Sequence, residues 1–284
     1  MKTARTAEEL AELRASASGR GSRVGFVPTM GALHAGHLSL VEIARREVGD
    51  AGLVVASIFV NPTQFAPHED FDRYPRPLER DRALLEEAGC DALFLPEHET
   101  IYPPGFGTWI YPAGAARGLE GDFRPHFFRG VATVVSRLFA LVQPDVAVFG
   151  EKDAQQLAVI GQLVRDLALP VAILGGPILR ESDGLAMSSR NAYLSADERR
   201  RAPRLYSALL AARALFEQGE RRGQALRDAV TTELAADHDI AMQYVEVVDP
   251  GTFSHLTDVP RAAVVALAVK LGKTRLIDNI RLEA

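Results

Sequence analysis

Short apolar segments alternate with amphipathic segments along the first two thirds of the chain, and this alternation is the strongest constraint on its fold. Strands that are apolar at nearly every position are typical of a parallel sheet covered on both faces. We expect strands near residues 23–28, 53–60, 91–95, 145–149 and 171–174. We expect helices near residues 37–48, 77–89, 130–142 and 153–168. The sequence therefore predicts an α/β domain with helices on both faces of a parallel sheet.

The pattern changes after residues 175–177, which read Gly-Gly-Pro. Helical segments are expected near 196–218 and 222–236, followed by strands near 241–248, 262–271 and 274–281. A run of helices followed by a run of strands favours a smaller α+β domain with an antiparallel sheet. We therefore expect domains at 1–178 and 179–284, with loops in the Gly-, Pro- and aromatic-rich stretch 96–128.

Composition excludes several classes of protein. The 284 residues are 47% hydrophobic and 24% charged, with a net charge of −5 and no long basic run, so a nucleic-acid partner is not expected. No apolar run is long enough to span a membrane, and the start of the chain lacks a signal-peptide core. We expect a cytoplasmic protein without a membrane partner. The single cysteine, Cys90, lies in an apolar run and is expected to be a buried structural thiol.

The first predicted strand runs directly into residues 28–37, which read PTMGALHAGH. His34 and His37 therefore lie where a strand turns into a helix, and the glycines of this segment let backbone approach a ligand. A helix N-terminus offers N–H donors and a partial positive charge, which suits the phosphates of ATP. At a spacing of three residues, both imidazoles can face one ligand. A histidine at this position is also a common helix cap, so both interpretations stay open.

Other polar motifs also follow predicted strands. Residues 61–65 read NPTQF and follow the second strand, while 150–153 read GEKD and follow the fourth. Because the carboxyl ends of parallel strands lie along one edge, these motifs and 28–37 are expected to meet at one cleft. Asn61 and Gln64 could bind a polar substrate with their amides, although Asn61 could equally cap a turn.

Residues after the fourth strand offer further groups. Lys152 can reach a phosphate, and Asp153 could bind a ribose hydroxyl or a metal ion, or cap the following helix. Of Gln155 and Gln156, one is expected to bind a small hydroxy acid and the other to be solvated. Farther along, 187–191 read MSSRN, whose hydroxyls and guanidinium could hold an anion.

The remaining histidines lack a metal-ligand spacing, so no zinc site is expected, and no residue is assigned as a metal ligand. They are His68, His98, His126, His238 and His255. His68 is expected to be a solvated loop residue.

Five motifs in a fixed order resemble those of the pantothenate synthetases, the pantoate–β-alanine ligase family. They are PTMGALHAGH at 28–37, FVNPTQF at 59–65, RPHFFRGVATVV at 124–135, FGEKDAQQL at 149–157 and SDGLAMSSRNAYLS at 182–195. The resemblance implies a Rossmann-like domain of the nucleotidylyltransferase type, a C-terminal α+β lid domain and a homodimer. It also implies a reaction in which ATP and pantoate form pantoyl adenylate and pyrophosphate, after which β-alanine displaces AMP to give pantothenate.

The resemblance also implies roles for individual residues. His34 and His37 would contact ATP, with His37 an active-site acid. The residues implied to bind ATP are Met30, Gly31, Ala32, Leu33, His34, Ala35, Gly36, His37, Gly150, Glu151, Lys152, Asp153, Leu179, Met187, Ser188, Ser189 and Arg190. Gln64 and Gln156 match the pantoate-binding glutamines. We expect His34, His37, Lys152 and Arg190 to perform catalysis by stabilising phosphate charge, with Mg²⁺ on the outer phosphates.

One motif departs from the family, whose usual order at 124–130 is Arg-Pro-Gly-His-Phe-Arg-Gly. Here His126 takes the place of the glycine and Phe127 that of the histidine, so neither residue is assigned a role. Two other functions are weighed. One is a different nucleotidylyltransferase with the same histidine motif, which adenylates a phosphate ester. The other is a catalytically silent nucleotide-binding or scaffold protein.

Overall fold

The computed structural model describes residues 1–18, 23–67 and 69–284, and these residues form two compact units. The first unit comprises residues 1–112, 124–151 and 159–177. The second comprises 113–123, 152–158 and 178–284, so it takes in two short stretches that precede the predicted boundary at 178. His68, predicted to be a solvated loop residue, lies outside the described residues.

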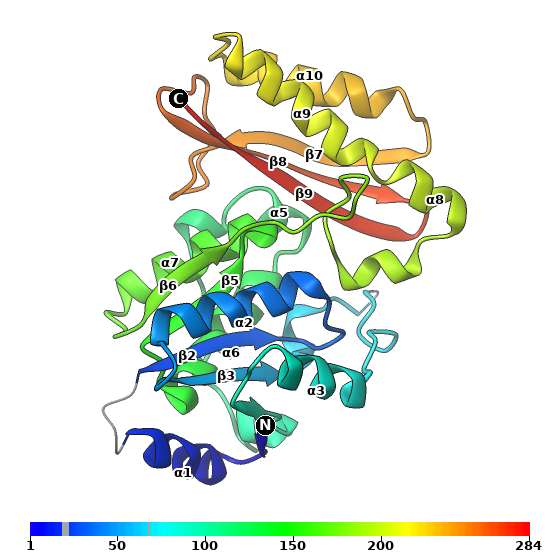
Figure 1. Ribbon diagram of the computed structural model, residues 1–284. Coiled ribbons are helices and arrows are strands. Elements are labelled where there is room, and N and C mark those ends of the chain that lie inside the picture. The colour runs from blue at the N-terminus through cyan, green and yellow to red at the C-terminus, as the bar shows by residue number, and fades with distance from the viewer. Residues whose placement is uncertain (19–22, 68) are drawn as a thin grey trace. The chain divides into compact units, whose positions relative to one another are not determined.

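Among the described residues, the first unit contains a six-stranded sheet in which every neighbouring pair is parallel. The strands are β1 (Lys2–Ala4), β2 (Val24–Thr29), β3 (Leu53–Ile58), β4 (Ala92–Phe94), β5 (Val146–Gly150) and β6 (Ala172–Gly176). The predicted parallel α/β fold is confirmed (Figure 1). Strand β1 was not predicted, because three residues are too few to show a periodic pattern.

Helices cover both faces of this sheet. They are α1 (Ala7–Ser18), α2 (Ala35–Val48), α3 (Leu78–Glu87), α4 (His98–Ile101), α6 (Phe127–Val142) and α7 (Ala154–Asp166), whose residues 154–158 belong to the second unit. On one face, Val27 of β2 packs in a cluster with Leu40 and Val41 of α2. On the other, the preceding residue, Phe26, meets Phe139 of α6 edge to face, with ring centroids 6.4 Å apart. This alternation explains why the strands are apolar throughout.

The sheet order is β1-β4-β3-β2-β5-β6, so β2 lies between β3 and β5. The chain proceeds from β2 outward through β3 and β4, and then returns to the other side of β2 with β5 and β6. Ligands of open parallel sheets bind at such a switch point, beyond the carboxyl ends of the strands. Here those ends are Thr29 of β2 and Gly150 of β5.

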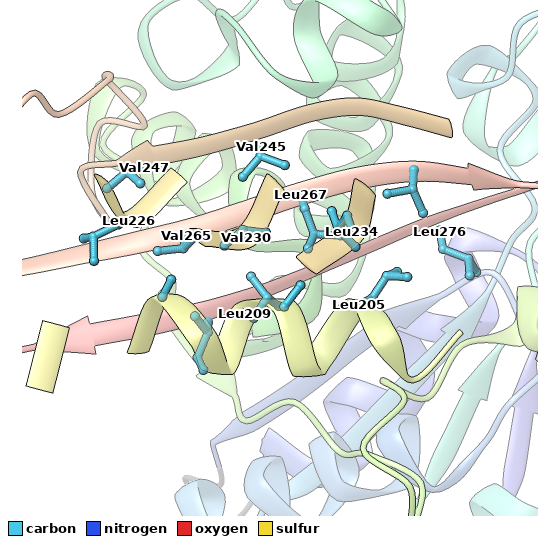
Figure 2. Close-up of a cluster of buried hydrophobic side chains, with 14 of the residues drawn as sticks. Leu205, Leu209, Leu226, Val230, Leu234, Val245, Val247, Val265, Leu267 and Leu276 are labelled. Atoms are coloured by element: carbon cyan, nitrogen blue, oxygen red, sulfur yellow. The ribbon is translucent and has the colours of Figure 1, made fainter. Parts of the chain in front are cut away.

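The second unit is α+β, as predicted. In the part of the chain that the structure describes, its sheet consists of β7 (Ile240–Val248), β8 (Ala262–Leu271) and β9 (Thr274–Glu283), paired antiparallel in that order. Its helices are α5 (Glu120–Phe123), α8 (Ala196–Arg201), α9 (Arg204–Glu217) and α10 (Gly223–Ala235). Figure 2 shows α9 and α10 packing their leucines and valines against one face of the sheet. The labelled members are Leu205, Leu209, Leu226, Val230, Leu234, Val245, Val247, Val265, Leu267 and Leu276.

Two helical predictions differ from the structure. The helix expected over 196–218 is divided into α8 and α9 at Pro203. A proline lacks the N–H that a continuing helix needs, but fits the start of a new one. The stretch 96–128, expected to form loops, contains the short helices α4 and α5. Single-turn helices bury too few residues to show a helical period in the sequence.

Candidate functional site

The two histidines of the first motif lie side by side at the start of α2. His34 is the N-cap residue, and its Nδ1 accepts a hydrogen bond from the Gly36 N–H at 3.2 Å. His37 Nδ1 accepts from the His34 N–H at 3.4 Å, which completes a reciprocal capping box. The ring centroids are 4.1 Å apart. The cap interpretation from the sequence is therefore correct, and the same bonds hold both rings at the helix N-terminus.

These bonds also determine which nitrogen of each ring carries a proton. A ring nitrogen that accepts a hydrogen bond has no proton of its own, so each neutral imidazole is protonated at Nε2. Nε2–H is a donor, the group that a phosphate oxygen requires. The capping geometry thus sets His34 and His37 as a pair of N–H donors at a positively polarised helix end.

The loop before α2 is held by Asp81, a residue that the sequence analysis did not select. Its side chain is 1% exposed, and its two oxygens accept the N–H groups of Ala32 at 2.8 Å and Leu33 at 2.9 Å. Gly31 and Ala32 both have positive φ, at 81° and 52°, so this turn needs such support. An aspartate on α3 has no distinguishing sequence pattern, which explains why it was missed.

Gln64 lies beside the histidine motif. The side chain is buried, and its Nε2 donates to the sulfur of Met30 at 3.1 Å. Asn61 donates to Gln64 Oε1 at 3.1 Å and to the Gly130 carbonyl at 3.2 Å, while its own Oδ1 accepts from the Tyr102 hydroxyl at 2.9 Å. Asn61 also caps the turn η1 (Pro62–Gln64). The structure therefore brings Met30, Asn61 and Gln64 together, with Asn61 orienting Gln64.

The same loop is tied to Arg124, a second residue that was not assigned a role. Arg124 forms a bidentate ion pair with Glu69 at 2.7 and 2.8 Å and donates to the Gln64 carbonyl at 3.1 Å. Burial alone would raise the pKa of Glu69, but the hydrogen bonds and charge of Arg124 hold it below its ordinary value. The guanidinium also stacks on Phe127, 3.9 Å from the ring centroid. Arg124 is the first residue of the third motif, and this position could have marked it as a functional residue from the sequence.

The GEKD segment continues from β5, the strand adjacent to β2. Gly150 ends the strand, and residues 151–153 form the 3-10 turn η3 (Glu151–Asp153), so Asp153 directly precedes α7. A Cβ added to Gly150 would meet no atom within 4 Å. Gly150 therefore borders open space at the switch point, and the cap and ligand interpretations of Asp153 both remain.

The two glutamines at the start of α7 differ in burial. Gln155 is 5% exposed, and its Nε2 donates to the carbonyl groups of Ala115, Arg117 and Gly118. Its Oε1 accepts from the Glu120 N–H at 2.9 Å. Gln155 is thus committed to holding residues 115–120 within the second unit, whereas Gln156 is partly exposed. The side chain of Gln155 is therefore engaged with this segment, and a ligand role for Gln156 stays a prediction.

Leu179 and the MSSR segment lie side by side in the second unit. Residues 179–187 form a hairpin in which Met187 donates to the Leu179 carbonyl at 2.9 Å and Arg180 pairs with Ala186. Ser188 then caps the turn η4 (Ser189–Tyr193), its hydroxyl accepting from the Arg190 N–H at 3.3 Å. The two ATP-binding segments implied by the resemblance are therefore adjacent in space.

Among residues 1–18, 23–67 and 69–284, the structure brings together no group of three His, Cys, Asp or Glu side chains able to hold a metal ion. In the same part of the chain, no helix is both long and apolar enough to cross a membrane. Cys90 is buried, as predicted, and burial raises the pKa of its thiol to about 11.

Comparisons with known proteins agree on one family. The family model described as pantoate-beta-alanine ligase matches residues 2–281. The pantothenate synthetase of Herpetosiphon aurantiacus is 53% identical over 260 residues, which are 91% of this chain and 93% of that protein. The crystal structure of pantothenate synthetase from Thermus thermophilus matches with a TM-score of 0.91 and 50% identity, and covers 99% of both chains.

A more distant structure adds ligands. The pantoate-beta-alanine ligase of Francisella tularensis matches with a TM-score of 0.80 and 34% identity, covering 99% of this chain and 97% of its own. It is described as complexed with beta-gamma ATP and beta-alanine.

Proposed function

The chain belongs to the pantoate–β-alanine ligase family, and on this premise we infer that it condenses pantoate with β-alanine to form pantothenate, using ATP. It is an AMP-forming carboxylate–amine ligase. The alternative is a nucleotidylyltransferase that adenylates a phosphate ester. It is not favoured, because relatives with 53% sequence identity over more than 90% of this chain are pantothenate synthetases. A silent scaffold is disfavoured by the retention of His34, His37, Lys152 and Arg190.

The chemistry proceeds in two steps. The pantoate carboxylate attacks the α-phosphorus of ATP and pyrophosphate leaves, which gives pantoyl adenylate. The neutral amine of β-alanine then attacks the acyl carbon and AMP leaves. The first step joins two anions, so the protein must orient them and stabilise charge that builds on the phosphates.

We propose that His34 and His37 donate from Nε2 to the phosphates of ATP, with His37 the active-site acid. The observation that supports this most is the reciprocal cap, which leaves Nε2 as the protonated nitrogen of both neutral rings. Residues 30–37 then bind ATP with backbone N–H groups at the start of α2. Each well-placed donor contributes roughly 3 kcal/mol of transition-state stabilisation.

Further ATP contacts are proposed for Gly150, Glu151, Lys152 and Asp153, and for Leu179 with residues 187–190. Lys152 and Arg190 would supply the cationic charge that the pyrophosphate group needs. In terms of domains, 1–178 would bind ATP and pantoate, and 179–284 would contribute the phosphate clamp.

For pantoate, we propose Gln64 and Gln156 as the binding amides. An amide can donate to the carboxylate and accept from a hydroxyl of the same small molecule. Asn61 belongs to this subsite through its hydrogen bond to Gln64.

Mg²⁺ is proposed as the companion of the triphosphate. The described residues offer no protein cage for it, and Mg²⁺ at nucleotide sites is held largely by phosphate oxygens and water. We assign it no step. A homodimer is proposed from the resemblance, and a cytoplasmic location from the need for ATP.

The test is release of pyrophosphate from ATP by the purified protein. Release should require pantoate, and pantothenate should form only after β-alanine is added. Release that requires a phosphate monoester without a carboxylate, and that pantoate does not support, would instead favour the alternative. No release when pantoate is added would refute the assignment as a pantoate–β-alanine ligase.

A further inference from the structure

Two adjacent residues of strand β9 contact the segments that carry the proposed phosphate ligands of the second unit. Asn279 is 6% exposed, and its Nδ2 donates to the backbone carbonyl of Lys152 at 2.9 Å. This bond joins residues 127 positions apart in sequence. It fixes the main chain from which the Lys152 side chain extends.

The neighbouring Asp278 holds the other segment. Its side chain is 1% exposed and forms a bidentate ion pair with Arg180, at 2.7 and 3.0 Å. Burial raises the pKa of Asp278, while the Arg180 hydrogen bonds and charge act in the opposite direction. The charge of Lys152 also acts on this carboxylate, so Lys152 lies within its electrostatic reach.

Arg180 lies next to Leu179 on the first arm of the hairpin 179–187 and pairs with Ala186 on the second. Beyond Asp278, it donates to the Gly184 carbonyl at 3.1 Å and to the Asn279 carbonyl at 3.2 Å, and its guanidinium lies 3.7 Å from the ring centroid of Tyr206. The residue before it, Leu179, accepts a hydrogen bond from Met187 on the other arm of the hairpin, and both of these residues are proposed ATP contacts. Because these contacts hold the guanidinium of Arg180, they fix the position of the hairpin, and with it the start of the 187–190 segment.

We propose that Asp278 and Asn279 are positioning residues for ATP, which hold the Lys152 segment and the 179–190 segment in one arrangement from a single strand. The proposal rests on the proposed function, since it takes those segments as phosphate ligands. Neither residue needs to touch ATP. A rigid strand interior is a precise support for such groups, because its backbone is fixed by pairing with β8 along the whole length.

Asn279→Ala removes the bond to the Lys152 carbonyl without inserting bulk. We expect the Kd of the whole protein for ATP, measured by calorimetry, to rise about fivefold to tenfold, with the Kd for pantoate unchanged. Loss of one hydrogen bond to a main-chain carbonyl justifies that magnitude. The matched control is Arg204→Ala, which breaks a side-chain bond of 3.2 Å to the Glu233 carbonyl between α9 and α10. It should leave both Kd values as in the parent.

Asp278→Asn tests the second contact, and Asp278→Glu, which keeps the charge, should recover part of the ATP affinity that Asp278→Asn loses. Equal weakening of ATP and pantoate binding in the Asn279 variant, in step with its melting temperature, would mean a structural role only and would overturn the proposal. Unchanged ATP binding in both Asn279→Ala and Asp278→Asn would also overturn it. Failure of the proposed function is separate: it would show as absent pantoate-dependent pyrophosphate release in the parent protein.

Discussion

At the scale of single residues, hydrogen bonds to the backbone determine the chemistry that the side chains can offer. The sequence places His34 and His37 at a helix start, where each could be a cap or a ligand. The structure shows the caps, and capping through Nδ1 leaves Nε2, at the other edge of each ring, as the donor nitrogen; the ligand role stays a proposal. Asp81 acts in the same way on main-chain groups, since its two oxygens fix the N–H groups of the preceding loop.

His37→Ala should abolish most of the adenylation rate. A single lost donor in a preorganised site typically lowers kcat about 10² to 10³-fold, and the fold should persist because only one capping bond is lost. Pantoate-dependent pyrophosphate release measures the rate, and thermal unfolding checks the fold. His238→Ala, at an exposed turn, is the control and should be silent. A His37 variant with near-normal turnover would remove the assignment.

Asp81→Asn is nearly isosteric, but it replaces one acceptor oxygen with an NH₂ group that faces a main-chain N–H. The buried N–H left without an acceptor should lower the free energy of unfolding by about 1 to 3 kcal/mol. The loosened 31–33 loop should raise the KM for ATP more than that for β-alanine. Asp50→Asn, at an exposed turn, provides the comparison. Equal stability of the two variants would contradict the role of Asp81.

At the scale of elements, two glycines distinguish packing from ligand space. Helix α6 approaches the 61–65 loop so closely that a Cβ on Gly130 would lie 2.7 Å from the Thr63 carbonyl oxygen and 2.8 Å from the Gln64 nitrogen. Gly150, at the carboxyl end of β5, has no atom within 4 Å of such a Cβ. The same substitution should therefore act on stability at one site and on ligand binding at the other.

Gly130→Ala must move either the helix or the loop, because backbone atoms block the methyl group. We expect a loss of about 1 to 3 kcal/mol in the free energy of unfolding and a higher KM for pantoate, since Gln64 moves with the loop. Gly161→Ala on α7 is the matched control: its Cβ would meet only the Arg165 side chain, at 3.5 Å. That variant should keep or gain stability. A Gly130 variant as stable as the Gly161 variant would disprove the close approach.

Gly150→Ala should show the opposite pattern. Its stability should be unchanged or raised by up to about 1 kcal/mol, because alanine restricts the unfolded chain. The KM for ATP should rise about tenfold if the nucleotide occupies the space beside β5. Unfolding in urea and steady-state kinetics measure the two effects. An unchanged KM would place the nucleotide away from this glycine.

The sequence was sufficient for the elements with long, regular patterns. Buried parallel strands are apolar throughout, so β2, β3 and β5 could be predicted, and the motifs that follow them could be assigned to one edge of a sheet. Contacts between segments distant in the chain could not be predicted from the sequence. Two examples are the hydrogen bond from Asn279 to the Lys152 carbonyl and the bonds that Asp81 accepts from the 31–33 loop. Neither leaves a local pattern in the sequence, because each depends on tertiary packing.

At the scale of the whole molecule, each unit has its own apolar core and a proton donor whose pKa is raised mainly by burial. In the first unit, burial raises the pKa of the Cys90 thiol to about 11, against an ordinary value of 9. In the second, burial and then the carboxylate of Glu120 raise the pKa of the Tyr244 hydroxyl well above 10. Both groups are therefore protonated in the folded protein at pH values where an unfolded chain has begun to lose the same protons.

This difference predicts the direction of alkaline destabilisation. Between pH 9 and about 11, unfolding releases the Cys90 proton, so rising pH favours the unfolded state. The free energy of unfolding should fall by about 1.4 kcal/mol per pH unit for this group, or about 3 kcal/mol over the interval. Tyr244 adds a fall of the same sign above pH 10. Denaturant unfolding at a series of pH values measures the slope.

Substitution of each group in turn shows which part of the fall in unfolding free energy with pH comes from that group. Cys90→Ala should flatten the decline that begins at pH 9, and Tyr244→Phe should flatten only the part above pH 10, because each removes one titrating proton. Each variant also loses packing or a hydrogen bond, such as that from Tyr244 to Glu120 at 2.8 Å, but those losses are the same at every pH below the titration. The comparison is therefore between slopes, not absolute stabilities. A Cys90→Ala slope identical to that of the parent from pH 9 upward would show that the thiol ionises in the folded protein as readily as in the unfolded chain.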